Sequence, residues 1–104
     1  MDEQMSFAEF LQSASGGGPP PSEIRSALAA LWYDRRGDWD RAHELAQATG
    51  DKDSAWVHAY LHRKEGDETN AGYWYRLAGR SASRSPLDEE WAQIAQALLN
   101  EENR

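Results

Sequence analysis

Three histidines are the residues of this chain best suited to chemistry. His58 and His62 are four residues apart in a segment with helical spacing, so their rings stand on one helix face, and Glu65 lies near the same side. His43, on the preceding predicted helix, is placed to supply a third ligand to a metal ion. A zinc-protease pattern would need Glu directly after the first His, where this chain has Ala59. The alternative interpretation is that these histidines are ordinary polar residues, facing solvent or a neighbouring helix.

Asn70 is the second candidate, because it falls inside the apolar arc of its predicted helix, next to Trp74. A buried amide without a hydrogen-bond partner costs roughly 1–3 kcal/mol. We expect its side chain to hold a backbone carbonyl or a loop in place. The functional alternative puts Asn70 at the floor of a pocket lined by Trp74, Tyr75 and His62. The candidate binding residues are therefore His43, His58, His62, Asn70 and Trp74.

Other catalytic patterns are missing from the sequence. There is no nucleophile elbow, phosphate-binding glycine loop or dinucleotide fingerprint. The chain has no cysteine, which excludes disulfides, thiol catalysis and cysteine-ligated zinc. The acids Asp88, Glu89 and Glu90 crowd the start of the last predicted helix, where the helix dipole favours them. Asp34 similarly reads as part of a solvated helix end. The first hypothesis consequently assigns no catalytic residue, no metal and no cofactor, and favours a protein that is not an enzyme.

A short pattern repeated 29 residues apart indicates the elements that position these residues. Gly37-Asp38 recurs as Gly66-Asp67, and each pair follows a helix-like segment that ends in basic residues. Glycine just past a helix end, followed by a capping Asp, is typical of two antiparallel helices joined by a tight turn. The sequence predicts an all-α fold of two tandem helical hairpins. Their helices are expected at about 22–36, 38–49, 53–65 and 67–78, with Ser22 capping the first and Gly50 ending the second.

Two further helices flank the predicted hairpins. A short helix opens at Ser6 with a capping box, and its Phe7, Phe10 and Leu11 favour docking on the body. Pro86 opens a last helix whose apolar stripe is expected to cap the end of the second hairpin. We therefore divide the chain into an N-terminal helix or arm (1–15), a Gly/Pro linker (16–21) and one helical-repeat domain (22–104).

Residues 22–80 resemble tetratricopeptide and Sel1-like repeats. The shared features are the hairpin, the Gly-Asp turn and a small residue, Ala42 or Ala71, in the second helix of each pair. Trp74-Tyr75 followed by Ala78 also looks like the end of a Sel1-like repeat. The resemblance implies a scaffold that holds protein or peptide partners.

A second resemblance covers residues 56–75, which look like part of a group of small uncharacterised microbial proteins, and this likeness implies no activity. The peptide clamp of some tetratricopeptide domains uses Asn and Lys on the first helix of a pair. Asn70 lies on a second helix, so no clamp residue is carried over.

The net charge of the chain limits the kinds of partner that it can bind. The net charge is −7, and it is concentrated in residues 1–21 and 86–104, whereas residues 22–85 are balanced. We expect no binding to nucleic acid or to an anionic membrane. Met1–Gln4 is acidic and lacks the basic start of a signal peptide, which favours a cytoplasmic protein.

The first functional hypothesis is a protein–protein interaction module of unknown pathway, with Tyr33, Trp39, Tyr73 and Trp74 as aromatic anchors. Its partner would be another protein or a second copy of the chain. The alternative is a small-molecule or metal-binding protein, with or without enzymatic activity, that uses the His/Asn cluster.

Overall fold

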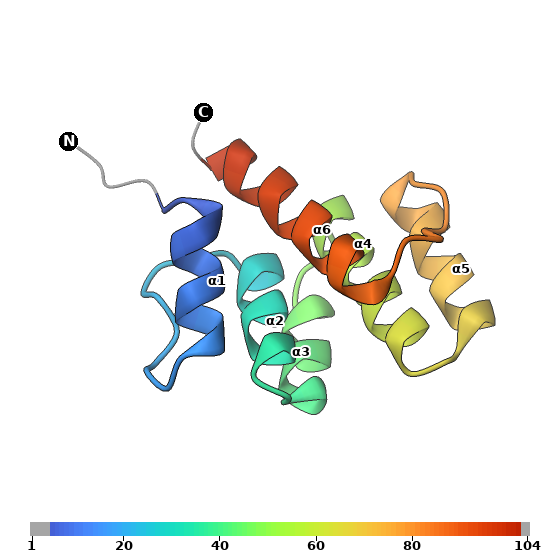
Figure 1. The fold of residues 1–104 in the computed structure, drawn as a ribbon. Coiled ribbons are helices and arrows are strands. Elements are labelled where there is room, and N and C mark those ends of the chain that lie inside the picture. Colours follow the sequence, from blue (N-terminus) through green and yellow to red (C-terminus); the bar gives the residue numbers. More distant parts are fainter. Residues whose placement is uncertain (1–4, 103–104) are drawn as a thin grey trace.

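The computed structural model describes residues 5–102, so the predicted features of Met1–Gln4 lie outside the described residues. The described chain is entirely helical and contains no strand, which confirms the all-α prediction (Figure 1). Its helices are α1 (Phe7–Ser15), α2 (Ser26–Arg35), α3 (Trp39–Ala46), α4 (Lys52–Lys64), α5 (Glu68–Ala78) and α6 (Leu87–Glu102).

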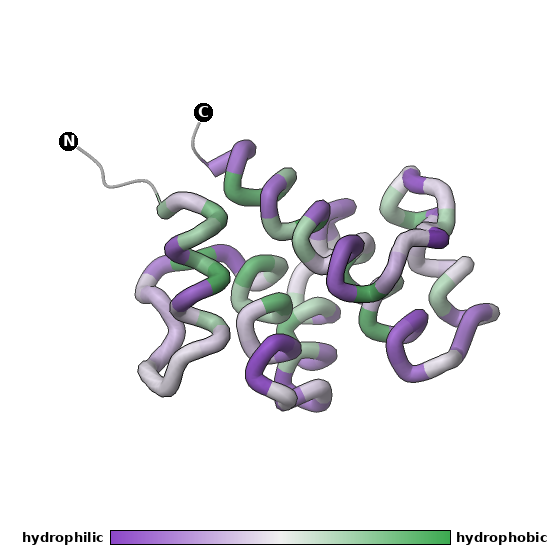
Figure 2. Tube along the Cα trace, viewed as in Figure 1, coloured by the Kyte–Doolittle hydropathy of each residue, from purple (hydrophilic) through white to green (hydrophobic). Residues whose placement is uncertain are grey.

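The repeated Gly-Asp pair forms the turns that the sequence predicts. Gly37 and Gly66 have φ of +88° and +90°, in the left-handed region that glycine enters without steric cost. The carboxylate of Asp38 then accepts the backbone N–H of Arg41 at 3.1 Å. The carboxylate of Asp67 accepts that of Asn70 at the same distance. These local hydrogen bonds fix where α3 and α5 begin. Figure 2 shows hydrophilic residues concentrated in the same turns.

Two predicted helix boundaries are wrong. Ser22 does not cap α2, which begins only at Ser26, after a turn in which Glu23 has φ of 63°. The guanidinium of Arg25 bonds to Asp53 at 2.6 Å and to Glu101 at 3.1 Å, and so ties this turn to α4 and α6. Contacts between distant parts of the chain therefore set the start of α2.

The second wrong boundary separates α3 from α4. Helix α3 ends at Ala46, well before Gly50. Asp51 accepts the N–H of Ser54 at 2.6 Å and caps α4, which begins at Lys52, one residue before the expected start at about 53. A carboxylate at the N-cap satisfies an otherwise free backbone donor, which accounts for the earlier start of α4.

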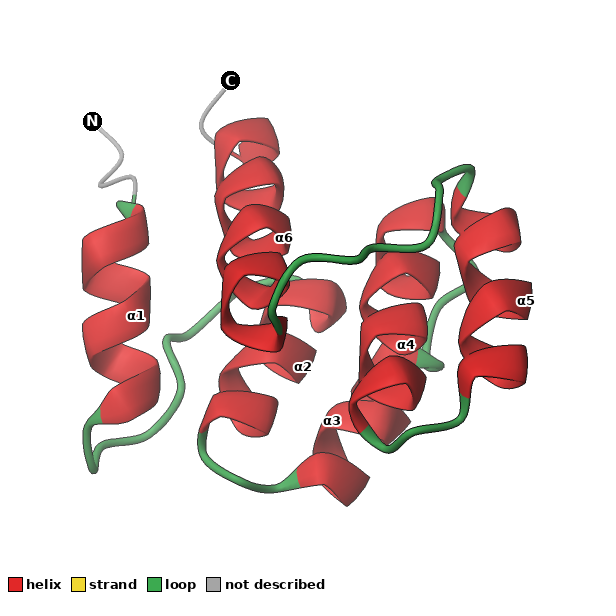
Figure 3. Ribbon diagram, turned by 45° about the vertical axis from the view of Figure 1, so that its right-hand side comes forward, coloured by secondary structure: helices red, strands yellow, loops and turns green. Residues whose placement is uncertain are grey.

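The helices pack mainly as neighbours along the chain, α2 with α3 and α4 with α5 (Figures 1 and 3). Helix α6 lies against α1, α2 and α4, and does not cap the end of the second pair as predicted. Its stripe of Trp91, Ile94 and Leu98 is buried there. Because α6 crosses both helix pairs, it joins them into one body.

The N-terminal helix is docked on that body. Phe10 and Ala14 of α1 are fully buried, and the Phe10 ring stacks on Trp91 with centroids 5.7 Å apart. The indole N–H of Trp91 donates to the Leu31 carbonyl at 3.0 Å, and Arg36 donates to the Ala14 carbonyl at 2.9 Å. No helix in the described part of the chain is long and apolar enough to cross a membrane.

Candidate functional site

The three histidines meet at the contact between α3 and α4. His43 projects from α3, and its Nε2 lies 2.9 Å from Nε2 of His58 on α4. One ring nitrogen of each of His43, His58 and His62 lies within 4.8 Å of the other two. His58 and His62 are only 2% and 7% exposed, and His43 is half-buried. Their face of α4 therefore packs against neighbouring helices and is closed to bulk solvent.

Two tryptophans hold these rings. Trp39 is one helical turn before His43, and the two rings stack at 4.9 Å with an interplanar angle of 11°. The Trp39 indole N–H donates to the Leu61 carbonyl at 3.1 Å, which fixes α3 on α4. From α5, Trp74 stacks on His58 at 3.8 Å and 19°. The histidines are thus enclosed between one indole from α3 and one from α5.

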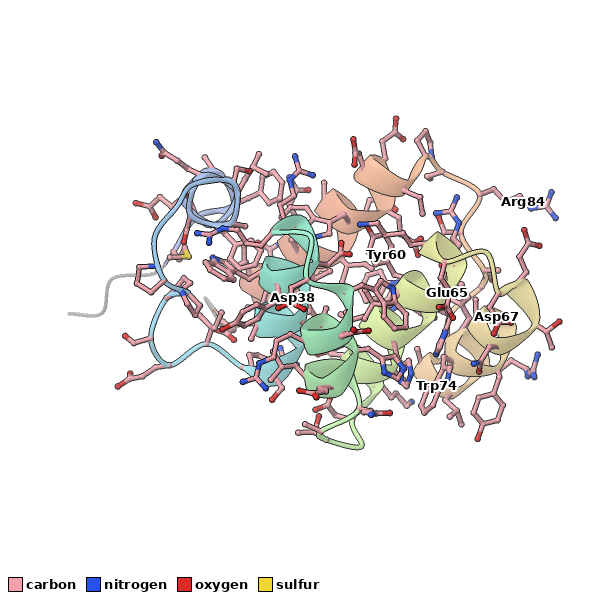
Figure 4. The ribbon with its side chains drawn as sticks, turned by 90° about the horizontal axis from the view of Figure 1, so that it is seen from below. Asp38, Tyr60, Glu65, Asp67, Trp74 and Arg84 are labelled. Carbon is pink, nitrogen blue, oxygen red and sulfur yellow. The ribbon has the colours of Figure 1, made fainter. Side chains whose placement is uncertain are left out.

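Hydrogen bonds define the tautomer of His62. Nδ1 lies 2.8 Å from a carboxylate oxygen of Glu65, so the Nδ1–H donates to Glu65. Nε2 then carries the lone pair, and the Asn70 side-chain nitrogen lies 3.4 Å from it. Figure 4 shows Glu65 and Asp67 at the turn between α4 and α5, with Trp74 of α5 below them in that view. A carboxylate that orients a histidine through its far nitrogen is a common arrangement behind metal ligands.

Burial keeps two of the rings uncharged. Burial, followed by the neighbouring His43 and His62, lowers the pKa of His58 to about 4. The pKa of His43 is also lowered, by burial and then by His62, against weaker opposing effects of Glu65 and Asp40. Nδ1 of His58 is the one buried side-chain nitrogen or oxygen, among residues 5–102, that has no hydrogen-bond partner.

All five predicted site residues lie together. His43, His58, His62, Asn70 and Trp74 form one cluster across α3, α4 and α5. The Asn70 side chain is half-buried and contacts His62, whereas the first expectation was that it holds a backbone carbonyl or a loop. Tyr75 does not join the cluster, since its hydroxyl donates to Glu90 of α6 at 2.5 Å.

Trp39 belongs to this cluster but was not predicted to do so. It was predicted only as an apolar face residue of its helix and as a candidate anchor for a protein partner. The signal that identifies it is its spacing, because Trp39 and His43 are four residues apart on one helix face.

Two acids are buried contrary to expectation: Asp34 was predicted to be part of a solvated helix end, and Glu90 to be one of the acids that the helix dipole favours at a helix start. Asp34 accepts the Tyr60 hydroxyl at 3.2 Å and the Lys64 ammonium at 2.8 Å. Glu90 accepts Arg63 at 2.8 Å, as well as Tyr75. Both carboxylates are paired and enclosed, so they hold helices together and lie outside the histidine cluster.

The donor set of the cluster suits a transition metal. Imidazole nitrogens are favoured ligands of zinc, copper, nickel and iron ions. His62, Glu65 and Asp67 form a second group within 4.8 Å, but it shares His62, and its two acids are exposed. The first group is therefore the better candidate for a metal centre.

No protein-family model, curated protein or solved structure matches this chain. The assignment of a function consequently depends on the geometry of the cluster.

Proposed function

We propose that this protein binds a divalent first-row transition-metal ion, with Zn²⁺ as the first candidate, through His43, His58 and His62. The observation that carries the proposal is the convergence of three imidazoles whose ring nitrogens lie within 4.8 Å of one another. Zinc sites with three protein ligands commonly use histidine nitrogens.

The cost of burying these rings supports the proposal. His58 is almost fully enclosed, and its Nδ1 lacks a partner among the described residues. A buried polar atom without a hydrogen bond costs roughly 1–3 kcal/mol, so a role in packing alone leaves the ring poorly satisfied. Coordination of a cation through Nε2 would leave Nδ1 as it is, but it would give the enclosed ring a strong bond on its other nitrogen and so offset part of the cost of burying the ring.

The surroundings supply what a histidine ligand needs. Glu65 already accepts the Nδ1–H of His62, so the lone pair of that ring lies on Nε2, where the Asn70 side chain at 3.4 Å would give way to a metal ion. Between His43 and His58, one proton occupies the 2.9 Å gap when both rings are neutral. Binding of a cation to both Nε2 atoms would move that proton to Nδ1 of the same ring, so both rings would remain neutral ligands.

Metal content measured on the purified protein tests the proposal. We expect one Zn²⁺ per chain by equilibrium dialysis and elemental analysis after loading, and loss of that ion in His58→Gln and His62→Gln. Asp40→Asn is the matched control, because it removes an exposed charge near His43 without removing a nitrogen ligand. Circular dichroism establishes that each variant is folded. Stoichiometric zinc in folded His→Gln variants, or no zinc in the wild type, would overturn the proposal.

A second candidate function is the interaction module expected from the sequence. Tyr73 and Leu77, four residues apart on α5, are 49% and 48% exposed and are the large exposed hydrophobics of residues 5–102. The other anchors, Tyr33, Trp39 and Trp74, are half-buried, so Tyr73 is the best remaining one. Two tandem hairpins, α2–α3 and α4–α5, related to tetratricopeptide or Sel1-like repeats, would present this surface.

Sedimentation of the wild type and of Tyr73→Ser/Leu77→Ser tests self-association through α5. A concentration-dependent dimer that the double variant abolishes would support it. A wild-type protein that sediments as a monomer at all concentrations would exclude self-association through α5.

A further inference from the structure

Among residues 5–102, the histidine cluster offers three candidate metal ligands, and no fourth His, Cys, Asp or Glu belongs to the same group. In the described part of the chain, the group that contains His43 and His58 holds no carboxylate. Glu65 is bonded to Nδ1 of His62, the nitrogen on the other side of the ring from Nε2. The chain has no cysteine that could complete the set. Four-coordinate zinc held by three protein ligands takes its fourth ligand from solvent or substrate, whereas closed structural sites use four protein ligands.

Asn70 is the polar side chain that lies beside the nitrogen through which His62 would bind the metal. Its side-chain nitrogen lies 3.4 Å from Nε2 of His62, on the metal-binding side of that ring. A carboxamide offers both N–H donors and a carbonyl acceptor, so it can hydrogen-bond to a bound anion or to water. Its backbone is fixed, because the Asn70 N–H donates to the Asp67 carboxylate at the start of α5.

Burial differs across the cluster and indicates where the fourth ligand enters. His58 and His62 are enclosed, while His43, Asn70, Trp39 and Trp74 are each half-buried. The half-buried members come from α3 and α5, which flank α4 on the side of the histidines. The side of the cluster formed by α3 and α5 is therefore the more exposed one, and it is the side from which a small ligand would approach.

We propose that the metal ion held by His43, His58 and His62 keeps an exchangeable fourth position that binds a small anionic oxygen or nitrogen donor, and that Asn70 is a positioning residue that hydrogen-bonds to this ligand. The inference rests on the proposed metal site and specifies its ligand class. The same position accepts water in the absence of the anion. An exchangeable position is what a metal needs to polarise a substrate or to activate water.

Co²⁺-loaded protein titrated with azide provides the test, because the visible spectrum of Co²⁺ reports its coordination. We expect one Co²⁺ per chain and a saturable change of the spectrum with azide. Asn70→Ala should keep one Co²⁺ per chain but bind azide roughly tenfold more weakly, as expected for one lost hydrogen bond to a charged group. Thr69→Ala is the matched control, since it alters an exposed neighbour on the same helix and should bind azide like the wild type.

The remaining outcomes separate this inference from the proposed function. Stoichiometric Co²⁺ with a spectrum that azide does not change would overturn the exchangeable position and leave the metal site intact. Unaltered azide affinity in folded Asn70→Ala, or loss of its Co²⁺, would overturn the positioning role. Absence of bound Co²⁺ in the wild type would refute the metal site itself, and this inference with it.

Discussion

Acidification should destabilise the metal-free protein between about pH 6.5 and pH 4, mainly through His58. In the folded state the pKa of His58 is lowered from 6.5 to about 4, because the ring is buried beside two other histidines. In the unfolded chain the ring is solvated and titrates near 6.5. The unfolded state therefore takes up its proton first, and the free energy of unfolding falls as the pH decreases through this window.

The size of the effect follows from the pKa difference. A shift of one pKa unit corresponds to about 1.36 kcal/mol, so a difference of about 2.5 units removes about 3 kcal/mol of stability. The lowered pKa of His43 acts in the same direction. Typical domains have roughly 5–15 kcal/mol in total, so the loss should be easy to measure. Asp51, whose pKa is lowered from 3.8, affects stability mainly below this window.

Urea unfolding in the presence of a chelator measures this prediction. The free energy of unfolding of the wild type and of His58→Gln is followed from about pH 7 to about pH 4. The Gln side chain does not titrate, so the variant should lose most of the dependence in this range. A wild type of constant stability down to about pH 4, or a variant with the same decline as the wild type, would refute the reasoning.

The remaining predictions concern packing, a buried acid and a turn. Trp91→Ala removes an enclosed indole and should lower the free energy of unfolding by about 3–5 kcal/mol in urea; a loss below about 1 kcal/mol would mean that α1 and α6 repack. Asp34→Ala leaves the buried Tyr60 hydroxyl without its acceptor and should cost about 1–3 kcal/mol by thermal unfolding, and an unchanged melting temperature would contradict this. Gly66→Ala forces a side chain into φ of +90° and should cost about 1 kcal/mol by the same assay, whereas no loss would indicate that the turn rearranges.

The parts of the fold that could be predicted depend on local interactions. The turns at Gly37 and Gly66 follow from one residue's conformational freedom and one capping carboxylate nearby in the chain. The placement of α6 depends instead on contacts such as Trp91 with Leu31, which are 60 residues apart. No local pattern specifies which helices a stripe will meet, so its packing on α2 and α4 was missed.

The candidate site likewise combines features that local spacing predicts with features that depend on contacts between helices. The spacing of His58 and His62 places both rings on one face, and that needs only helix geometry. Burial of Asp34 and Glu90 depends on Tyr60 and Tyr75, which lie on other helices. Acids near helix ends are usually solvated or favoured there by the helix dipole, so the sequence did not predict that Asp34 and Glu90 are buried. Their partners become apparent only when the packing is known.

The positions of the histidine nitrogens bear on how a metal would bind. In a tetrahedral site with bonds of 2.0–2.1 Å, ligand nitrogens lie about 3.3 Å apart. His43 and His58 are already at 2.9 Å, and the third nitrogen lies within 4.8 Å. The hydrogen bond from Trp39 to the Leu61 carbonyl already holds α3 on α4, so the remaining adjustment falls to the side chains and not to the helices.

Helix α3 is only eight residues long and would not be stable alone, so its docking precedes the meeting of the ligands. The folded chain therefore presents a cluster that is largely arranged beforehand, and a metal would stabilise the protein by mass action on the native state without being needed for folding.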